Sequence, residues 1–106
     1  MQDDRERPQR EFGEGLRNIK RAIVEALADI QVRATEADIE HLPNWERGED
    51  IPDLTVMNVR PPGAPVVTAE FSRAQIEDSW RILERPDVTG RVRAIAAEYR
   101  RLRQLR

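Results

Sequence analysis

The sequence of 106 residues contains no cysteine and a single histidine. Without cysteine the chain can form neither a disulfide framework nor a thiolate metal site, and it has no cysteine nucleophile. One histidine also excludes most multi-histidine metal sites. The sequence has no glycine-rich loop of the kinds that cradle nucleotide phosphates. We therefore predict neither a metal nor another cofactor, and we expect that the chain is not an enzyme.

Aromatic residues and long apolar runs are also scarce. The chain has two Phe, two Trp and one Tyr, and no window approaches the ~20 apolar residues that a membrane span needs. The first 15 residues carry five acidic groups and no apolar run, which is unlike a secretory signal. We expect a cytoplasmic protein without membrane contact. Because 36% of the residues are charged, we expect one domain with a small core.

Charge is plentiful but unevenly spread along the chain. Of the 18 basic residues only Lys20 is a lysine, a bias that indicates GC-rich coding and is typical of a bacterium or its phage. Residues 31–53 hold seven acids against two arginines, and residues 91–106 hold six arginines against Glu98. The formal net charge of −2 therefore hides an acidic middle and a basic tail.

The first predicted element is a long helix over residues 14–33. Apolar residues recur there at steps of three and four, which places them on one helix face: Leu16, Ile19, Ile23, Leu27, Ile30 and Ala34. The polar residues 1–12 precede it, and we predict that they form a flexible arm before a single domain over residues 13–106. Thr35 and Asp38 resemble a second helix cap.

That second cap predicts a further helical turn or two over residues 36–42, with Ile39 and Leu42 facing inward. Pro43 ends this helix, and residues 43–53 form an acidic loop. Two short runs rich in β-branched residues, 54–60 and 66–71, then flank a proline-rich loop and predict a β-hairpin.

After the hairpin, Ser72 and Gln75 form a capping box that opens a helix. Ile76, Trp80 and Leu83 give this helix an apolar stripe, Pro86 ends it, and a last helix follows. The predicted fold class is thus α+β, with a long N-terminal helix, a β-hairpin and two C-terminal helices in one small domain. The predicted core consists of Leu16, Ile19, Ile23, Leu27, Ile30, Val56, Val67, Phe71, Ile76, Trp80, Leu83, Val92, Ile95 and Tyr99. If Trp80 is in the core, its replacement by alanine costs about 3–5 kcal/mol.

The sequence offers little for catalysis or metal binding. His41 is the one side chain with an ordinary pKa near neutral pH, and at a predicted helix end it can serve as a cap. The loop acids Glu46, Glu49, Asp50 and Asp53 do not match the spacing of a calcium-binding EF-hand loop. We interpret them as a solvated loop and assign no catalytic, cofactor or metal residue.

We therefore predict a non-enzymatic protein-interaction or regulatory module that acts through protein contacts as a homodimer or with another protein. The segregated charge can guide such contacts, although the acidic loop can equally fold onto the basic tail of the same chain. Trp45 either covers the core or contacts a partner. The candidate partner-binding residues are Trp45, Glu46, Glu49, Asp50, Arg100, Arg101 and Arg103.

Two alternatives remain open. The arginine-rich C-terminal helix can contact phosphates, which would make the chain a small nucleic-acid-associated regulator. The chain can also be an accessory subunit of an enzyme, and a concave site that converges on His41 or on the acidic loop would favour a role in catalysis.

Overall fold

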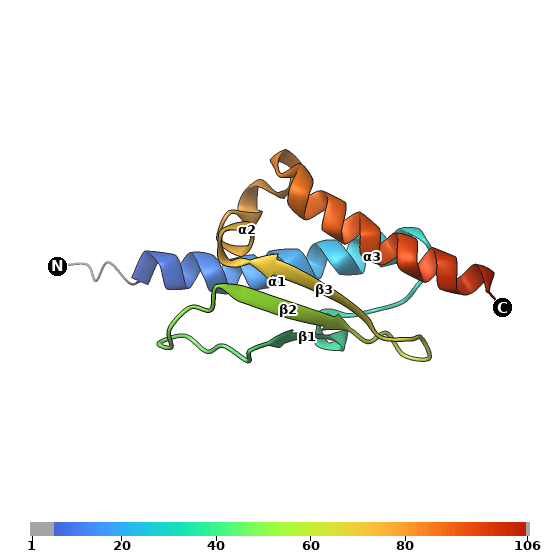
Figure 1. Cartoon of the computed structure of the whole chain (residues 1–106), viewed down its shortest axis with the longest axis horizontal. Coiled ribbons are helices and arrows are strands. Elements are labelled where there is room, and N and C mark those ends of the chain that lie inside the picture. Colours follow the sequence, from blue (N-terminus) through green and yellow to red (C-terminus); the bar gives the residue numbers. More distant parts are fainter. Residues whose placement is uncertain (1–5, 106) are drawn as a thin grey trace.

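Two long helices lie against one face of a three-stranded antiparallel sheet (Figure 1). The computed structural model describes residues 6–105, apart from the side chains of residues 81–83. The predicted α+β class, with a long N-terminal helix, a β-hairpin and helices at the C-terminal end, is confirmed. In chain order the elements are α1 (Glu6–Asp29), the 3₁₀ turn η1 (Glu36–Asp38), strands β1 (Ile39–Leu42), β2 (Leu54–Val59) and β3 (Val67–Ser72), helix α2 (Arg73–Glu77), the 3₁₀ segment η2 (Ser79–Glu84) and helix α3 (Pro86–Gln104).

Helix α1 begins earlier than the apolar spacing predicts. It starts at Glu6, so the prediction of a flexible arm over residues 1–12 is wrong for the part that is helical, and residues 1–5 lie outside the described residues. Phe12 explains the extension. Its side chain is completely buried, and its ring meets that of Trp45 edge-on, with the ring centroids 4.9 Å apart. Burial of this ring stabilises the added turns of helix.

Helix α1 ends in a hydrogen-bonded reversal rather than at the predicted residue 33. The Gln31 N–H donates to the Ala28 carbonyl, and the Val32 N–H donates to the Leu27 carbonyl. Gln31 has a φ of 63°, which is the left-handed conformation that closes a helix with this pair of bonds. The reversal directs the chain back toward the sheet.

A third strand, β1, lies where the sequence predicts a helix over residues 36–42. The Asp38 carboxylate does accept a hydrogen bond from the Thr35 N–H at 2.8 Å, but the helical turn stops there. Alternate residues of a strand face opposite sides, so Ile39 is 3% exposed whereas Leu42 is 40% exposed. The prediction that both point inward is wrong for Leu42, because pairing with β2 replaces the helical spacing.

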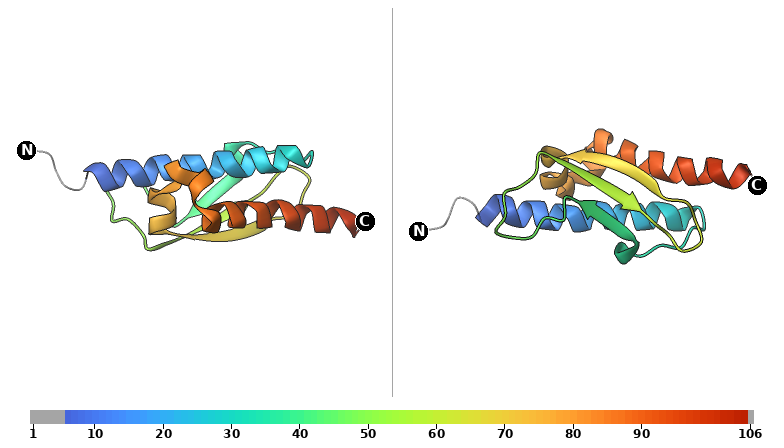
Figure 2. Two further views of the ribbon diagram at one scale, coloured as in Figure 1. Left: turned by 90° about the horizontal axis from the view of Figure 1, so that it is seen from above. Right: turned by 60° about the horizontal axis from the view of Figure 1, so that its bottom comes forward.

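The sheet has the order β1-β2-β3, and each neighbouring pair is antiparallel. In the central strand Thr55, Met57 and Val59 are buried toward the helices, whereas Val56 and Asn58 alternate with them. Helices α1 and α3 run in the same direction along the buried face (Figure 2, left). No element covers the opposite face in the part of the chain that the structure describes (Figure 2, right).

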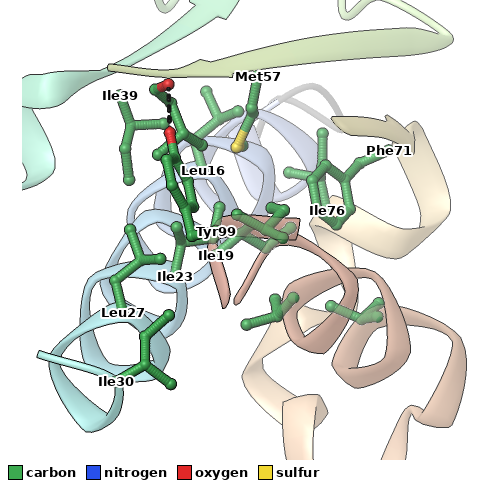
Figure 3. Close-up of a cluster of buried hydrophobic side chains, with 14 of the residues drawn as sticks. Leu16, Ile19, Ile23, Leu27, Ile30, Ile39, Met57, Phe71, Ile76 and Tyr99 are labelled. Atoms are coloured by element: carbon green, nitrogen blue, oxygen red, sulfur yellow. Dashed lines mark hydrogen bonds between the residues drawn. The ribbon is translucent and has the colours of Figure 1, made fainter. Parts of the chain in front are cut away.

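The core fills the space between this sheet and the helices (Figure 3). Most of the predicted core residues are buried: Leu16, Ile19, Ile23, Leu27, Ile30, Phe71, Ile76, Val92, Ile95 and Tyr99. Ile39, which was predicted to face inward, is also in the core. Four further members were absent from the predicted core: Phe12, Met57, Val59 and Val88. Val67 is partly buried and packs against the core. Val56 is on the opposite face of the sheet, so its assignment to the core is wrong.

Trp80 is 65% exposed, and its assignment to the core is wrong. The helix that begins at Ser72 with the predicted capping box ends at Glu77. The chain continues as the 3₁₀ segment η2. A 3₁₀ helix has three residues per turn instead of 3.6, so a step of four from Ile76 no longer reaches the same face. The side chain of Leu83 lies outside the described part of the structure.

Tyr99 ties α3 to the loop between β2 and β3. Its hydroxyl lies 3.1 Å from the Val59 carbonyl oxygen (Figure 3). The same hydroxyl lies 2.7 Å from the Pro65 carbonyl oxygen. Burial raises the pKa of this phenol, so the group stays a hydrogen-bond donor over the ordinary pH range. One hydroxyl therefore holds both ends of the loop against α3.

Candidate functional site

The acidic loop over residues 43–53 and the arginine-rich tail lie at opposite ends of the molecule. The loop over residues 43–53 lies beside the N-terminal half of α1, whereas Arg100, Arg101 and Arg103 lie in the last turns of α3 (Figure 1). The acidic loop is therefore not folded onto the basic tail of the same chain. The seven candidate partner-binding residues form two separate surfaces.

Trp45 covers the core. Besides its edge-on contact with Phe12, its indole Nε1–H donates a hydrogen bond to the Glu49 carbonyl oxygen at 3.1 Å. The side chain is half-buried. The structure shows the packing role among the two that the sequence left open, and partner contact by Trp45 stays a prediction.

The acidic side chains of the loop are exposed, and part of their hydrogen bonding is local. Glu49 accepts a hydrogen bond from the Glu46 N–H at 2.7 Å through its carboxylate. Gln9 of α1 accepts from the Gly48 N–H at 2.6 Å and donates to the Glu49 carbonyl at 3.0 Å. Asp50 is exposed. These bonds hold the loop against α1.

The arginines of the basic tail differ in their partners. Arg101 forms a hydrogen-bonded ion pair with Glu98 one turn earlier, which lowers the pKa of that carboxyl. Arg100 and Arg103 are exposed, and within residues 6–105 neither forms an ion pair. Cations in the last turn of a helix also favour its dipole.

His41 lies on β1 and not at a helix end, so its predicted capping role is wrong. Its Nδ1 is 2.8 Å from the Lys20 ammonium of α1. Because that ammonium donates, Nδ1 accepts and the imidazole is neutral. Burial lowers the pKa of His41, the charge of Lys20 lowers it further, and the Trp45 backbone and Glu40 act in the opposite direction.

This arrangement predicts a loss of stability in mild acid. Above the ordinary pKa of 6.5, the imidazole is neutral in both the folded and the unfolded chain. Below pH 6.5 the imidazole of the unfolded chain binds a proton, whereas the imidazole of the folded chain stays neutral because its pKa is lowered. The free energy of unfolding therefore falls with pH until the pH passes the lowered pKa of the folded chain. Urea unfolding at about pH 7.5 and about pH 5.5 gives the free energy of unfolding at each pH. The difference between the two free energies should be smaller for His41→Gln than for the unchanged chain. Equal differences would contradict the lowered pKa.

Strand β3 has a free main-chain edge. The Arg73 N–H donates to the Asp53 carbonyl at 3.0 Å, and these residues are directly opposite when the β2–β3 register is extended by one step. Hydrogen-bonded pairs alternate in an antiparallel ladder, so Thr68 and Glu70 turn their N–H and C=O groups away from β2. No other main-chain group of the described residues bonds to them.

A groove of about 730 Å³ lies between this free edge and α3. Its β3 side consists of residues 65–70. On α3 the lining residues follow a helical spacing that presents one face: Arg91, Ala94, Ile95, Glu98 and Leu102. The groove therefore combines unpaired backbone groups with an apolar floor, one arginine (Arg91) and two acidic residues (Glu70 and Glu98).

Sequence reasoning missed this groove. The hairpin strand and the helix were both predicted, but which strand is at the edge depends on β1, which was predicted as a helix. The available signals were the alternation along residues 66–71 and the helical spacing, by three and then four residues, of Arg91, Ala94 and Glu98.

Among the residues that the structure describes, no three acidic or histidine side chains gather so that they could hold a metal ion. None of the helices in residues 6–105 has the length and apolar character needed to cross a bilayer. No family model, no curated protein and no solved structure matches this chain.

Proposed function

We propose that this chain is a non-enzymatic protein-interaction module that pairs with a second copy of itself through the groove between β3 and α3. The observation that carries the proposal is the free edge of β3. Unpaired N–H and C=O groups of an edge strand are a template for another strand. Natural edge strands are often blunted by proline, charged side chains or a bulge. Thr68 to Glu70 contain no proline or lysine, their register with β2 has no bulge, and Glu70 is the one charged side chain among them.

A second copy fits this edge because the contact is self-complementary. In a two-fold arrangement centred on Thr68, each Thr68 main chain bonds to its equivalent, and the two sheets join into one antiparallel sheet. The helices α3 of the two copies then lie on the same side of the joined sheet and run antiparallel to each other.

Charges on α3 favour the same arrangement. Strand β3 and helix α3 run in opposite directions (Figure 1). Along the groove Arg91 and Glu98 lie on either side of Ala94. A two-fold axis at Thr68 brings Arg91 of each copy toward Glu98 of the other. Opposite charges then face each other twice.

Thr68→Pro tests the edge pairing. The Thr68 N–H points away from β2, so proline removes no hydrogen bond from the β2–β3 ladder and is tolerated in an edge strand. Sedimentation equilibrium should show a dimer for the unchanged chain and a monomer for Thr68→Pro with an unchanged far-UV spectrum. A monomer for the unchanged chain at every concentration would overturn the proposal.

A charge exchange on α3 tests the orientation. Arg91→Glu and Glu98→Arg should each weaken the dimer about tenfold, and the double variant should restore it, because opposite charges face each other again. Arg100→Glu is the control, since Arg100 is exposed on the same helix and does not line the groove. Failure of the double variant to recover would rule out this two-fold geometry.

Nucleic-acid binding is a second candidate, and the exposed Arg100 and Arg103 favour it. Phosphate contacts by these side chains would make binding weaken steeply with salt. A gel shift with duplex DNA and with RNA at low ionic strength should then be lost in the Arg100→Gln/Arg103→Gln variant. No shift for the unchanged chain would exclude this candidate and leave the dimer proposal unaffected.

A further inference from the structure

A second concave site lies at the other end of the fold from the basic tail. It is a cavity of about 310 Å³ between α1, the end of β1 and the loop that follows β1. Residues from all three segments line it. The side chains on which the argument depends are Arg10, Arg17, Lys20, His41, Trp45 and Arg47.

The lining is strongly cationic. Three arginines and one lysine face a single acidic residue, Glu14. Among the described residues, none of Arg10, Arg17 and Arg47 forms an ion pair. The positive charges of the cavity therefore have no internal counter-charge of equal size, and they repel one another more strongly in a partly enclosed site than in water.

Lys20 is held in place on the wall of this cavity. Its ammonium donates to Nδ1 of His41, which fixes the lysine against the imidazole. Burial lowers the pKa of Lys20, and Glu36 acts in the opposite direction. A bound anion would relieve the cost of placing a charged ammonium at this partly buried position.

The loop that carries Arg47 is also held in position. Gln9 bonds through its side chain to the main chain of both Gly48 and Glu49, and Trp45 is fixed by its own hydrogen bond to Glu49. Arg47 therefore projects from a segment fastened to α1. Because the backbone of this loop is already held, a bound ligand has to order the Arg47 side chain and not the loop as well, which lowers the entropy cost of binding.

We propose that this cavity binds the phosphate group of a small molecule. Several guanidinium and ammonium groups on one concave surface are the donors that recognise phosphate oxygens. The volume of about 310 Å³ is at the lower end of small-molecule sites, which suits a phosphate group with a small organic part. Trp45 offers an apolar wall for that part.

Nuclear magnetic resonance titration at constant ionic strength tests the proposal with two probes. Inorganic phosphate should shift the amide signals of Arg17, His41 and Arg47 along saturable curves. Phenyl phosphate, which adds a ring to the same group, should shift these signals and also the Trp45 indole signal. Tighter binding of phenyl phosphate assigns the site to a phosphate monoester, whereas equal binding of both probes assigns it to free phosphate.

Arg17→Gln and Arg47→Gln supply the decisive comparison. Each removes one charged donor from an exposed position and should weaken binding of inorganic phosphate about tenfold. Arg21→Gln is the matched control, because Arg21 is an exposed arginine of the same helix that does not line the cavity, and it should leave the affinity unchanged. Shifts that never saturate, or equal weakening in all three variants, would overturn the proposal, since both indicate only general attraction to a positive surface.

Discussion

Phe12→Ala should lower the free energy of unfolding by about 3–5 kcal/mol. Phe12 is completely buried and packs with Trp45 at a ring separation of 4.9 Å, so alanine leaves a cavity and removes an aromatic contact. The first turns of α1 then lose the side chain that anchors them. Urea unfolding gives the size of the loss, and amide hydrogen exchange should show faster opening at the start of α1.

Trp80→Ala is the contrasting variant. Trp80 is the larger side chain, but it is 65% exposed, so we expect its replacement to cost no more than about 1 kcal/mol. This expectation reverses the one drawn from the sequence, which placed Trp80 in the core. A loss for Trp80→Ala that equals the loss for Phe12→Ala would mean that α2 and η2 pack differently from the structure described above.

Gly15→Ala should also destabilise the fold, by about 1–3 kcal/mol or more. Glycine is a poor helix residue, so in an exposed helix the same change would stabilise by about 1 kcal/mol. A Cβ at Gly15, however, would lie 1.8 Å from the Ile76 carbonyl oxygen and 2.7 Å from its carbonyl carbon. Both are main-chain atoms of α2, so α1 and α2 must move apart to admit a methyl group.

Gly13→Ala is the matched control on the same helix. Its Cβ would meet only the Trp45 ring, at 3.7 Å from Cζ3, which is ordinary van der Waals contact. The helix preference of alanine then dominates, and we expect a gain of about 0.5–1 kcal/mol. Opposite signs for Gly13→Ala and Gly15→Ala in thermal unfolding would confirm the close approach of α1 and α2, and equal signs would contradict it.

The parts of the fold with a repeated local pattern could be predicted from the sequence. The apolar spacing of α1 and the capping box of Ser72 and Gln75 depend on neighbours a few residues apart. Strand β1 could not be predicted in this way. Four residues with Ile39 and Leu42 three apart fit one helical turn as well as a strand, and pairing with β2, more than ten residues later, decides between them.

The candidate sites were harder to predict for the same reason. The arginine-rich stretch of α3 is visible in the sequence, but the groove needs β3 at the sheet edge with α3 running alongside it. The cationic cavity combines Arg17 and Lys20 with Arg47, which is on a loop more than twenty residues away. In the sequence Arg47 stands among acidic residues of the loop, whereas the fold places it beside the cations of α1.

Tyr99 is synthesised after both of the carbonyl groups that its hydroxyl contacts. Tyr99 lies 34 residues after Pro65 and 40 residues after Val59. The loop between β2 and β3 therefore leaves the ribosome well before the hydrogen bonds that hold it can form. Until α3 has been made, the inner surface of the hairpin around Met57 and Phe71 lacks the part of its cover that α3 supplies. A nascent chain halted before α3 should therefore bind chaperones, and release should follow once Tyr99 has emerged.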